Sequence, residues 1–376
     1  MSLFYKKAST IITDIANWPG IDANNQQALS AAHTERLRDC MLAEWHPQSA
    51  VQITWPDEET DWKPWLKEVT ACYLRMAYEI SVTQQLIITC KNPDEINGLL
   101  QEKLPKKALD NITLVKCSNN DTWVRDYGFI TVLENGSYKL LDFRFNGWGG
   151  KFESDADNAI NKCLYDKNIL RGDYQNCQDF VFEGGSIESD GQGTLLTTSQ
   201  CLLNPNRNPG MTKADIEQQL LDRLKSNRVL WLDHGYLAGD DTDSHIDTLA
   251  RLCPNDTIVY VKCNDDNDEH FSELQKMERQ LATFQTRKGE PYRLISLPMA
   301  PKLYDDEGNR LPSTYANYLV INKGRILMPT YGDRETDSAA ALALEKAFPG
   351  YNVTGIDCRI LVMQHGSLHC STMQYY

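Results

Sequence analysis

Short apolar and β-branched runs recur along the chain, each bounded by polar and turn-forming residues. Such runs are typical of strands in a buried sheet. We expect core strands in VQITW (51–55), QQLIITC (84–90), ITLVKC (112–117), TLLTT (194–198), VLWLD (229–233), TIVYVKC (257–263) and YRLISL (292–297). Two hairpins are also predicted, because Asn135-Gly136 interrupts GFITVLENGSYKLLDF and Asn322-Lys323-Gly324 interrupts YLVINKGRILMPTYGD.

Helical periodicity lies between these runs. TKADIEQQLLDRLKSN begins at Thr212, a residue type that caps helices, and Asp215 follows three residues later as in a capping box. The same periodicity predicts helices within 60–81, 268–285 and 336–350. Strands and helices alternate along the chain, which predicts an α/β fold.

The chain shows no Gly/Ser-rich linker and no abrupt change of composition. Five or so strand–helix groups correspond to repeats of about 75 residues. We interpret residues 41–376 as a single domain built from divergent repeats. Residues 1–40 are a polar N-terminal extension, which we expect to pack on that domain, and NNQQALSAAHTERLRDCM predicts a helix at its end.

The composition bounds the class of protein. The 376 residues are 41% hydrophobic and 24% charged, which suffices for a sizeable core. A formal charge of −14 argues against a nucleic-acid partner and favours a small cationic one. No apolar run approaches the roughly 18–20 residues of a membrane helix, and the first residues lack the apolar core of a signal peptide. We therefore expect a soluble, cytoplasmic protein with no membrane partner.

The eleven cysteines are dispersed, odd in number and without a C-x-x-C pair. This pattern favours free thiols over a disulfide scaffold, and most of them should be small buried hydrophobes. Cys370 stands out because it lies near the end of the chain, in HGSLHC. It follows the strand-like run RILVM, and Gly366 and Ser367 can bend the backbone there and expose its side chain.

A reactive Cys370 would need a basic partner from elsewhere, because His369 points to the opposite face of an extended strand. His245 is the best candidate. In SHID, His245 and Asp247 are two residues apart and share one face if the segment is extended. A cysteine that only fills space, and a hydrogen-bonded core histidine, are the competing interpretations.

Two further carboxylates lie in segments dense in polar residues: Asp126 in WVRDYG, and Glu183 before Gly184-Gly185. Each is ordinarily a solvated loop charge or part of a bend. Together with Asp247, however, they could hold a planar cation through paired N–H···O bonds. A cysteine thiolate could then attack the carbon of a bound guanidinium group, which is covalent catalysis on an amidine.

Seven segments in matching order, from about residue 41 to the end, resemble the agmatine deiminase family of guanidino-group-modifying enzymes. They are MLAEWHPQSAVQITWP, NDTWVRDYGF, DFRFNGWGGKF, EGGSIESDGQGTLLTTSQCLLNPNRNP, TDSHIDTLARL, STYANYLVINKGRILMPTYGD and HGSLHCSTMQ. The resemblance implies a five-bladed α/β propeller with pseudo-fivefold symmetry around a central substrate pocket. It also implies hydrolysis of agmatine to N-carbamoylputrescine and ammonia, within putrescine and polyamine metabolism, without metal or cofactor.

The matching motifs also imply roles for individual residues. Cys370 resembles the nucleophile, His245 the general acid and base, and Glu183 the partner that orients the histidine. Asp126 and Asp247 resemble the carboxylates that grip the guanidinium.

Other matches are less informative about the chemistry. Trp123 resembles the family's tryptophan near the pocket, although core packing explains it equally well. Residues 206–209 match another family segment, to which we assign a scaffold role. QHGSLHC stands where relatives carry a glycine-rich run, and SHID where many have GHVD. These departures bear on pocket shape and substrate preference.

Alternatives remain open. A deiminase of arginine or of peptidyl-arginine would use the same chemistry, but the motif segments show no basic cluster for a substrate carboxylate. An amidinotransferase would require an amine acceptor. A zinc hydrolase could use His365, His369 and Cys370, since H-x-x-x-H suits a helix, but Gly366 disfavours a helix there. A non-catalytic binding protein would have kept these residues by coincidence. The oligomeric state stays open, a homo-oligomer included.

Overall fold

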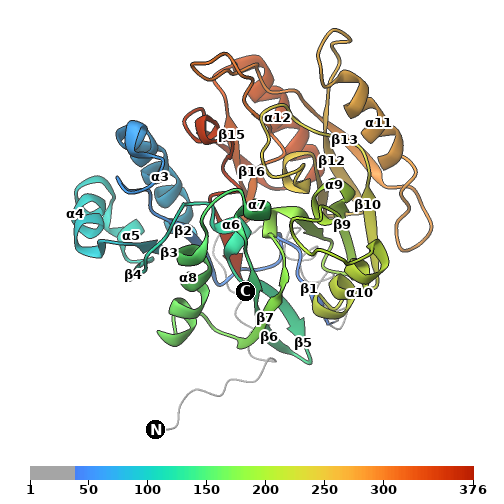
Figure 1. The fold of residues 1–376 in the computed structure, drawn as a ribbon. Coiled ribbons are helices and arrows are strands. Elements are labelled where there is room, and N and C mark those ends of the chain that lie inside the picture. Colours follow the sequence, from blue (N-terminus) through green and yellow to red (C-terminus); the bar gives the residue numbers. More distant parts are fainter. Residues whose placement is uncertain (1–38) are drawn as a thin grey trace.

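The computed structural model describes residues 39–376, and the strands of this part of the chain form five sheets (Figure 1). In strand order they are β1 (Cys40–Met41), β5 (Ile130–Glu134), β6 (Ser137–Arg144) and β7 (Asp173–Val181); β10 (Arg228–Leu232), β9 (Thr194–Thr198) and β8 (Ile187–Ser189); β11 (Ala250–Cys253), β12 (Thr257–Lys262) and β13 (Arg293–Pro298); β14 (Leu319–Ile321), β15 (Arg325–Thr330) and β16 (Asn352–Asp357); and β17 (Met373–Tyr375), β2 (Ala50–Thr54), β3 (Gln85–Cys90) and β4 (Ile112–Lys116).

The helices of the described residues lie between these strands. They are η3 (Lys63–Trp65), α3 (Leu66–Ser81), α4 (Pro93–Lys103), α5 (Lys106–Leu109), α6 (Val124–Tyr127), α7 (Gly147–Gly150), α8 (Asp155–Asp166), η4 (Gly184–Ser186), α9 (Ser199–Leu202), α10 (Lys213–Arg223), η5 (Ile246–Thr248), α11 (Phe271–Leu281), α12 (Arg334–Ala347) and η6 (Leu361–Gln364), where η marks a 3-10 helix.

The five sheets share one pattern, an antiparallel pair of strands next to a parallel pair. Parallel neighbours require a crossover connection, and α8, α10, α11 and α12 supply it in four of the sheets. In the remaining sheet α3 connects β2 to the parallel strand β3, while the antiparallel partner of β2 is β17. The last strand of the chain therefore completes the sheet that contains β2.

Side chains fasten this end of the chain inside the molecule. The hydroxyl of Tyr375 donates a hydrogen bond to Oε1 of Gln52 at 2.6 Å, and the hydroxyl of Tyr376 donates to the carbonyl of Ala43 at 2.9 Å. Both tyrosines are buried. The segment around Cys370 is thus held between two ordered elements, η6 and β17.

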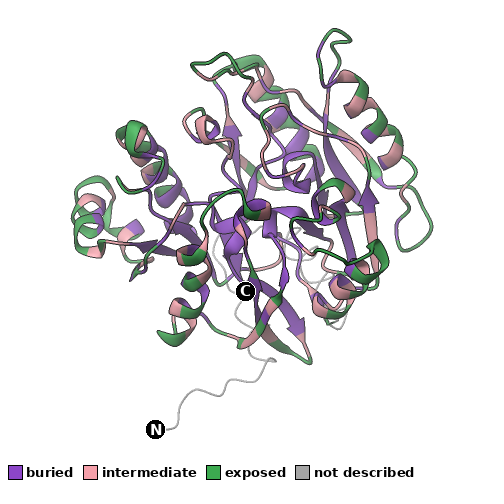
Figure 2. Ribbon diagram, in the orientation of Figure 1, coloured by how far each residue is buried: buried purple, intermediate pink, exposed green. Residues whose placement is uncertain are grey.

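The core lies among the strands, and the helices expose their outer faces, as Figure 2 shows. In α11, for example, Leu274, Met277 and Leu281 are buried at spacings of three and four residues, which is one face of a helix. Among the described residues, no helix combines the length and the apolar character that crossing a membrane requires.

Where the structure describes them, the predicted strands, hairpins and helices are confirmed, with exceptions at residues 40–41 and 359–363. The core runs appear as β2, β3, β4, β9, β10, β12 and β13, and the hairpins as β5–β6 and β14–β15. The capping box of Thr212 and Asp215 is present in α10. The helix predicted at the end of the N-terminal extension lies, up to residue 38, outside the described residues. For its last residues the prediction is wrong, because Cys40–Met41 form the strand β1, which pairs with β5.

The strand-like interpretation of RILVM is also wrong. Residues 361–364 form the 3-10 helix η6, which ends at His365 with a φ of 63°. The amide of Leu361 donates to the carbonyl of Cys358, so the chain turns directly after β16. Leu361 and Val362 are buried in the core from this turn, which explains why an apolar run here is not a strand.

Candidate active site

The candidate residues lie in the connections between the sheets. If Asn317, which the sequence analysis did not name, is included, each of the five connections from the last strand of one sheet to the first strand of the next carries at least one residue of the candidate site. Asp126 lies between β4 and β5, Glu183 between β7 and β8, His245 and Asp247 between β10 and β11, Asn317 between β13 and β14, and Cys370 between β16 and β17. The fold thus gathers residues that are far apart in the sequence.

Asp126 is held by groups from two other segments. Its Oδ1 accepts a hydrogen bond from the amide of Gly185 at 2.9 Å, and its Oδ2 accepts one from the indole of Trp148 at 2.9 Å. Nδ1 of His245 lies 3.6 Å from the same Oδ1. A Cβ atom at Gly185 would lie 2.6 Å from that nitrogen and 2.8 Å from Oδ1 of Asp126, so only glycine fits between them.

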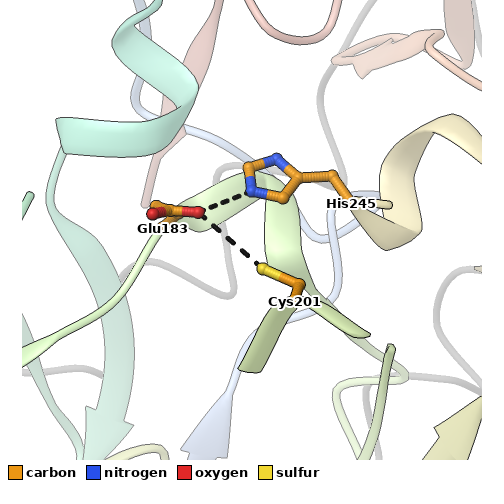
Figure 3. A group of neighbouring side chains, drawn as sticks. All are labelled: Glu183, Cys201 and His245. Atoms are coloured by element: carbon orange, nitrogen blue, oxygen red, sulfur yellow. Dashed lines mark hydrogen bonds and ion pairs between the residues drawn. The ribbon is translucent and has the colours of Figure 1, made fainter. Parts of the chain in front are cut away.

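Glu183 orients His245 from the other side of the ring, as Figure 3 shows together with the neighbouring Cys201. Nε2 of His245 lies 2.7 Å from Oε2 of Glu183. Arg207 in turn donates to both carboxylate oxygens of Glu183 at 2.9–3.1 Å, and to the carbonyl of Thr242 at 2.9 Å. Residues 206–209 therefore support the site directly, beyond the scaffold role expected for them.

Asp247 is supported by the residue that precedes Cys370. Its Oδ2 lies 2.7 Å from Nδ1 of His369, and Nε2 of His369 lies 2.6 Å from Oε2 of Glu44. Arg251 donates to the same oxygen of Glu44 at 3.0 Å. All of these side chains are buried.

Cys370 is positioned by Asn317. The amide of Asn317 donates to Sγ of Cys370 at 3.2 Å, and its carbonyl oxygen accepts from the backbone amides of His369 and Cys370. Sγ of Cys370 lies 3.9 Å from Oδ2 of Asp247. Cys370 is 7% exposed and lines a cavity of about 320 Å³.

The cavity is acidic and partly aromatic. Its wall includes Trp148 and Trp123, the residue for which the sequence analysis left a pocket role and core packing open, but neither lysine nor arginine is among its described lining residues. The aspartates of the wall are Asp61, Asp121, Asp126, Asp240 and Asp241. Such a wall attracts a cation and repels a carboxylate.

Two buried polar atoms of the site have no hydrogen-bonding partner among the described residues: Nδ1 of His245 and Oδ1 of Asp247. Buried polar atoms are normally paired, so each unpaired one calls for an explanation, such as a catalytic role. Both residues lie around the position that a side chain at Gly185 would occupy. These atoms are therefore available to a bound molecule.

The carboxylates differ in their tendency to ionise. Burial raises the pKa of Asp126 to about 6, although the neighbouring His245 acts against this. Burial also acts to raise the pKa of Glu183 and of Asp247, but their partners outweigh it. His245 and Arg207 lower the pKa of Glu183, and His369 lowers the pKa of Asp247.

The imidazole and the thiol both retain their protons more strongly than usual. Burial acts to lower the pKa of His245, but the carboxylate of Asp126 and the hydrogen bond to Glu183 raise it well above its ordinary value. Burial, followed by the charges of Asp247 and Asp126, raises the pKa of the Cys370 thiol. A cation bound between the two aspartates would lower that pKa by cancelling their charge.

One group of metal-ligand side chains occurs in the described part of the chain, namely Glu183, Cys201 and His245, whose donor atoms lie within 4.8 Å of one another. The guanidinium of Arg207, bound to both oxygens of Glu183, would repel a metal ion there.

The zinc set considered from the sequence is not assembled. Nδ1 of His365 lies 2.7 Å from the carbonyl of Gly239, while both nitrogens of His369 face carboxylates.

His245 and Asp247 do converge, as the sequence predicts, but from the start of η5 and not from an extended strand.

Sequence reasoning did not predict the orienting role of four supporting residues, namely Trp148, Arg207, Asn317 and His369. Three of them lie in the quoted motifs NGWGGKF, NPNRNP and STYANY. The first two carry polar or aromatic residues beside glycine or proline, and the third directly follows Pro312. That composition predicts an irregular connection between elements. It does not predict which other side chains the connection contacts. His369 was considered only as a base for Cys370 and as a zinc ligand.

Comparison with known proteins identifies the family. The family model of Porphyromonas-type peptidyl-arginine deiminase matches residues 40–375, and the chain belongs to this family. The chain is 31% identical over 358 residues to a "putative agmatine deiminase" of a Marinomonas species, a match that covers 89% of this chain and 93% of that protein. The resemblance to agmatine deiminases expected from the motifs is therefore confirmed.

Solved structures agree with this assignment. A "putative arginine deiminase" from Porphyromonas gingivalis is 47% identical with a TM-score of 0.84, and the match covers 90% of this chain and 98% of that one. A cysteine-to-serine variant of C. jejuni agmatine deiminase with substrate bound is 37% identical with a TM-score of 0.82, over 90% of this chain and 96% of that one. The mixed α/β fold is thus confirmed.

Proposed function

We propose that the chain is an agmatine deiminase, which hydrolyses agmatine to N-carbamoylputrescine and ammonia. The observation that carries this proposal is the cavity. A buried thiol, Cys370, lines it together with five aspartates and without lysine or arginine among the described lining residues. Agmatine carries positive charge at both ends, so both ends of the substrate suit such a wall. Relatives named agmatine deiminase over most of the chain add support.

In the first half-reaction, Asp126 and Asp247 hold the guanidinium flat beside Cys370. The charge of the bound cation lowers the pKa of the thiol, which gives its proton to solvent, and the resulting thiolate attacks the guanidinium carbon. His245, which holds a proton because its pKa is raised, gives it to the departing nitrogen. The C–N bond breaks, ammonia leaves, and a thiouronium on Cys370 remains.

In the second half-reaction, the now neutral His245 removes a proton from water, and the oxygen attacks the thiouronium carbon. The C–S bond breaks as the ureido product forms. The proton left on the new hydroxyl group passes to the departing sulfur, which restores the Cys370 thiol and the protonated His245. Glu183 keeps the ring oriented through both steps by its 2.7 Å contact with Nε2.

A deiminase of free arginine or peptidyl-arginine is the second candidate, because the matching family model and the P. gingivalis structure carry those names. Free arginine would bring a carboxylate into a wall that contains Asp240 and Asp241. No described lining residue supplies a lysine or arginine to compensate for it. This charge argument favours agmatine over free arginine, and an arginyl peptide has to be tested directly.

The arrangement of the five sheets belongs to the same proposal. They repeat one strand pattern, and every connection between them carries a candidate residue. This regularity supports a five-bladed α/β propeller with pseudo-fivefold symmetry, in which residues 41–376 form one catalytic domain around a central pocket. A cytoplasmic role in putrescine and polyamine metabolism follows from the proposed reaction.

A substrate panel tests the proposal. Ammonia release is measured with agmatine, free arginine and an arginyl peptide, each with the wild type and with Cys370→Ser as the matched control. We expect agmatine to give the highest kcat/KM and the variant to give none above background. A preference for arginine or the peptide would reject agmatine as the substrate. Release of the substrate's amine without ammonia, and only with an added amine acceptor, would indicate amidino transfer.

A further inference from the structure

Two thiols outside the candidate active site lie in direct contact. The sulfur atoms of Cys117 and Cys163 are 2.8 Å apart, although the residues are separated by 46 positions in the sequence. Cys117 follows β4, and Cys163 lies in α8. A disulfide bond has a length of about 2.0 Å, so the sulfurs need to approach by less than about 1 Å to form one.

The backbone around this pair is held in place by hydrogen bonds between the two elements. Oδ1 of Asp157 in α8 accepts from the amides of Asn120 and Asp121, and Oδ1 of Asn120 accepts from the amide of Ala156. On the other side, the amide of Cys117 donates to the carbonyl of Cys90 at 3.0 Å. The two thiols therefore stay together while the fold is intact.

The two thiols differ in access to solvent. Cys117 is 7% exposed, and burial together with its contact with Cys163 raises the pKa of its thiol to about 12. Cys163 is half-buried, so a small reagent in solution can reach it. Cys163 is thus the sulfur that reacts first, and Cys117 is placed to react with it second.

We infer that Cys117 and Cys163 form a site for reversible disulfide formation with a low-molecular-weight disulfide such as glutathione disulfide. The Cys163 thiolate attacks one sulfur of the reagent, its S–S bond breaks, and one glutathione leaves as a thiolate. Cys117 then loses its proton and attacks Cys163, which releases the second glutathione. The protein loses two hydrogens, and the reagent takes up both electrons.

The bond would link neighbouring sheets. It joins the end of β4 to α8, which connects β6 to β7, and it closes a loop that contains Asp126 and Trp148. Closing a loop of this length restricts the unfolded chain and so stabilises the folded one. We expect the melting temperature to rise by about 2–5 °C on oxidation and to return after dithiothreitol.

A second thiol pair provides a comparison within the same protein. Cys358 is in hydrogen-bonding contact with Cys72, but Cys358 is 0% exposed and Cys72 is 7% exposed. Contact alone would allow this pair to oxidise as well. Because neither sulfur is reachable from solvent, we expect it to stay reduced in the folded protein.

The experiment uses full-length Cys370→Ser protein, so that the thiol in the cavity cannot react. It is incubated with glutathione disulfide and measured by intact mass and by non-reducing peptide mapping. We expect a loss of two hydrogens with no glutathione retained, and one cross-link, between the peptides that contain Cys117 and Cys163. An unchanged mass, a retained glutathione, or a link between Cys72 and Cys358 in its place would overturn the inference.

Two variants in the same background test the order of the steps. With Cys117→Ala, we expect one glutathione to remain on Cys163, because the second sulfur is missing. With Cys163→Ala, we expect no modification at Cys117, because its thiol is buried. Modification of Cys117 in the absence of Cys163 would contradict the proposed order.

Discussion

Nδ1 of His369 lies 2.7 Å from Oδ2 of Asp247, so the residue next to Cys370 in the chain supports a carboxylate of the candidate site. Its other nitrogen lies 2.6 Å from Oε2 of Glu44. The guanidinium of Arg251 lies 3.1 Å from the same Nε2. His369 thus connects Glu44 and Arg251 to Asp247, and its contact with Asp247 lowers the pKa of that carboxylate.

Replacing His369 by glutamine should therefore impair substrate binding in a pH-dependent way. His369 lowers the pKa of Asp247, so its loss raises that pKa, and Asp247 becomes protonated at a higher pH. Without His369, burial acts unopposed by this partner and raises the pKa of Asp247 toward that of Asp126, so we expect the acidic limb of kcat/KM for agmatine to become steeper and to move to higher pH. His234→Gln, at a half-exposed ion pair with Glu273, is the control. A drop in activity or stability without a shift of the limb would indicate a purely structural role for His369.

Asp126 sets a second pH dependence. Burial raises its pKa to about 6, so the carboxylate is protonated below this pH and cannot hold a guanidinium. The indole N–H of Trp148 stabilises the ionised form, and Trp148→Phe removes this hydrogen bond. We expect kcat/KM of the wild type to fall below about pH 6, and the variant to begin its fall at higher pH.

The same substitution at Trp231 is the matched control. The indole of Trp231 donates to Glu217, and Trp231 is not among the lining residues of the cavity. Its variant should keep the wild-type pH profile. Identical acidic limbs in all three proteins would show that Trp148 does not tune Asp126.

Gly185 should tolerate no side chain. A Cβ atom there would lie 2.6 Å from Nδ1 of His245 and 2.8 Å from Oδ1 of Asp126, so alanine must push these groups apart. We expect Gly185→Ala to lower kcat/KM by about 100-fold, since misplacement by about 1 Å can cost that much. Gly98→Ala, where nothing lies within 4 Å, should be nearly neutral. Full activity of Gly185→Ala in a folded protein would refute the geometry described for this site.

Arg207 should matter for stability as well as for activity. It is buried against Glu183, and its removal leaves that carboxylate uncompensated. We expect Arg207→Met to lower the free energy of unfolding by about 3–5 kcal/mol in urea denaturation. Arg223→Met breaks a pair with the largely exposed Asp179 and should cost less than about 1 kcal/mol. Equal losses in the two variants would show that Glu183 does not depend on Arg207.

The hydrophobic pattern predicted the central strands but not all edge strands. β7 (DYQNCQDFV) and β16 (NVTGID) pair on one side only and expose many of their side chains, so their sequences are largely polar. Strands buried on both faces, such as β2, β9 and β12, carry the short apolar and β-branched runs that made them recognisable. The apolar run RILVM before Cys370 was wrongly interpreted as a strand, because its apolar side chains pack into the core from a 3-10 turn.

In the candidate site, too, some residues could be predicted from the sequence and others could not. Cys370, His245, Glu183, Asp126 and Asp247 could be predicted because their residue types and motifs carry chemistry. The groups that orient them could not, because such contacts depend on which connections meet in space. Asn317, for example, bonds to Cys370 across 53 positions of sequence, and no local pattern encodes that meeting.

The central claim is that the sulfur of Cys370 bonds to the guanidinium carbon of agmatine during turnover. It is tested most directly by mixing wild-type protein with excess agmatine, quenching in acid within the first turnovers, and measuring the intact mass. We predict a species heavier by the mass of agmatine less ammonia, which maps to the peptide containing Cys370 and is absent from Cys370→Ser. Turnover at full rate by Cys370→Ser, or an adduct on any other residue, would contradict the account.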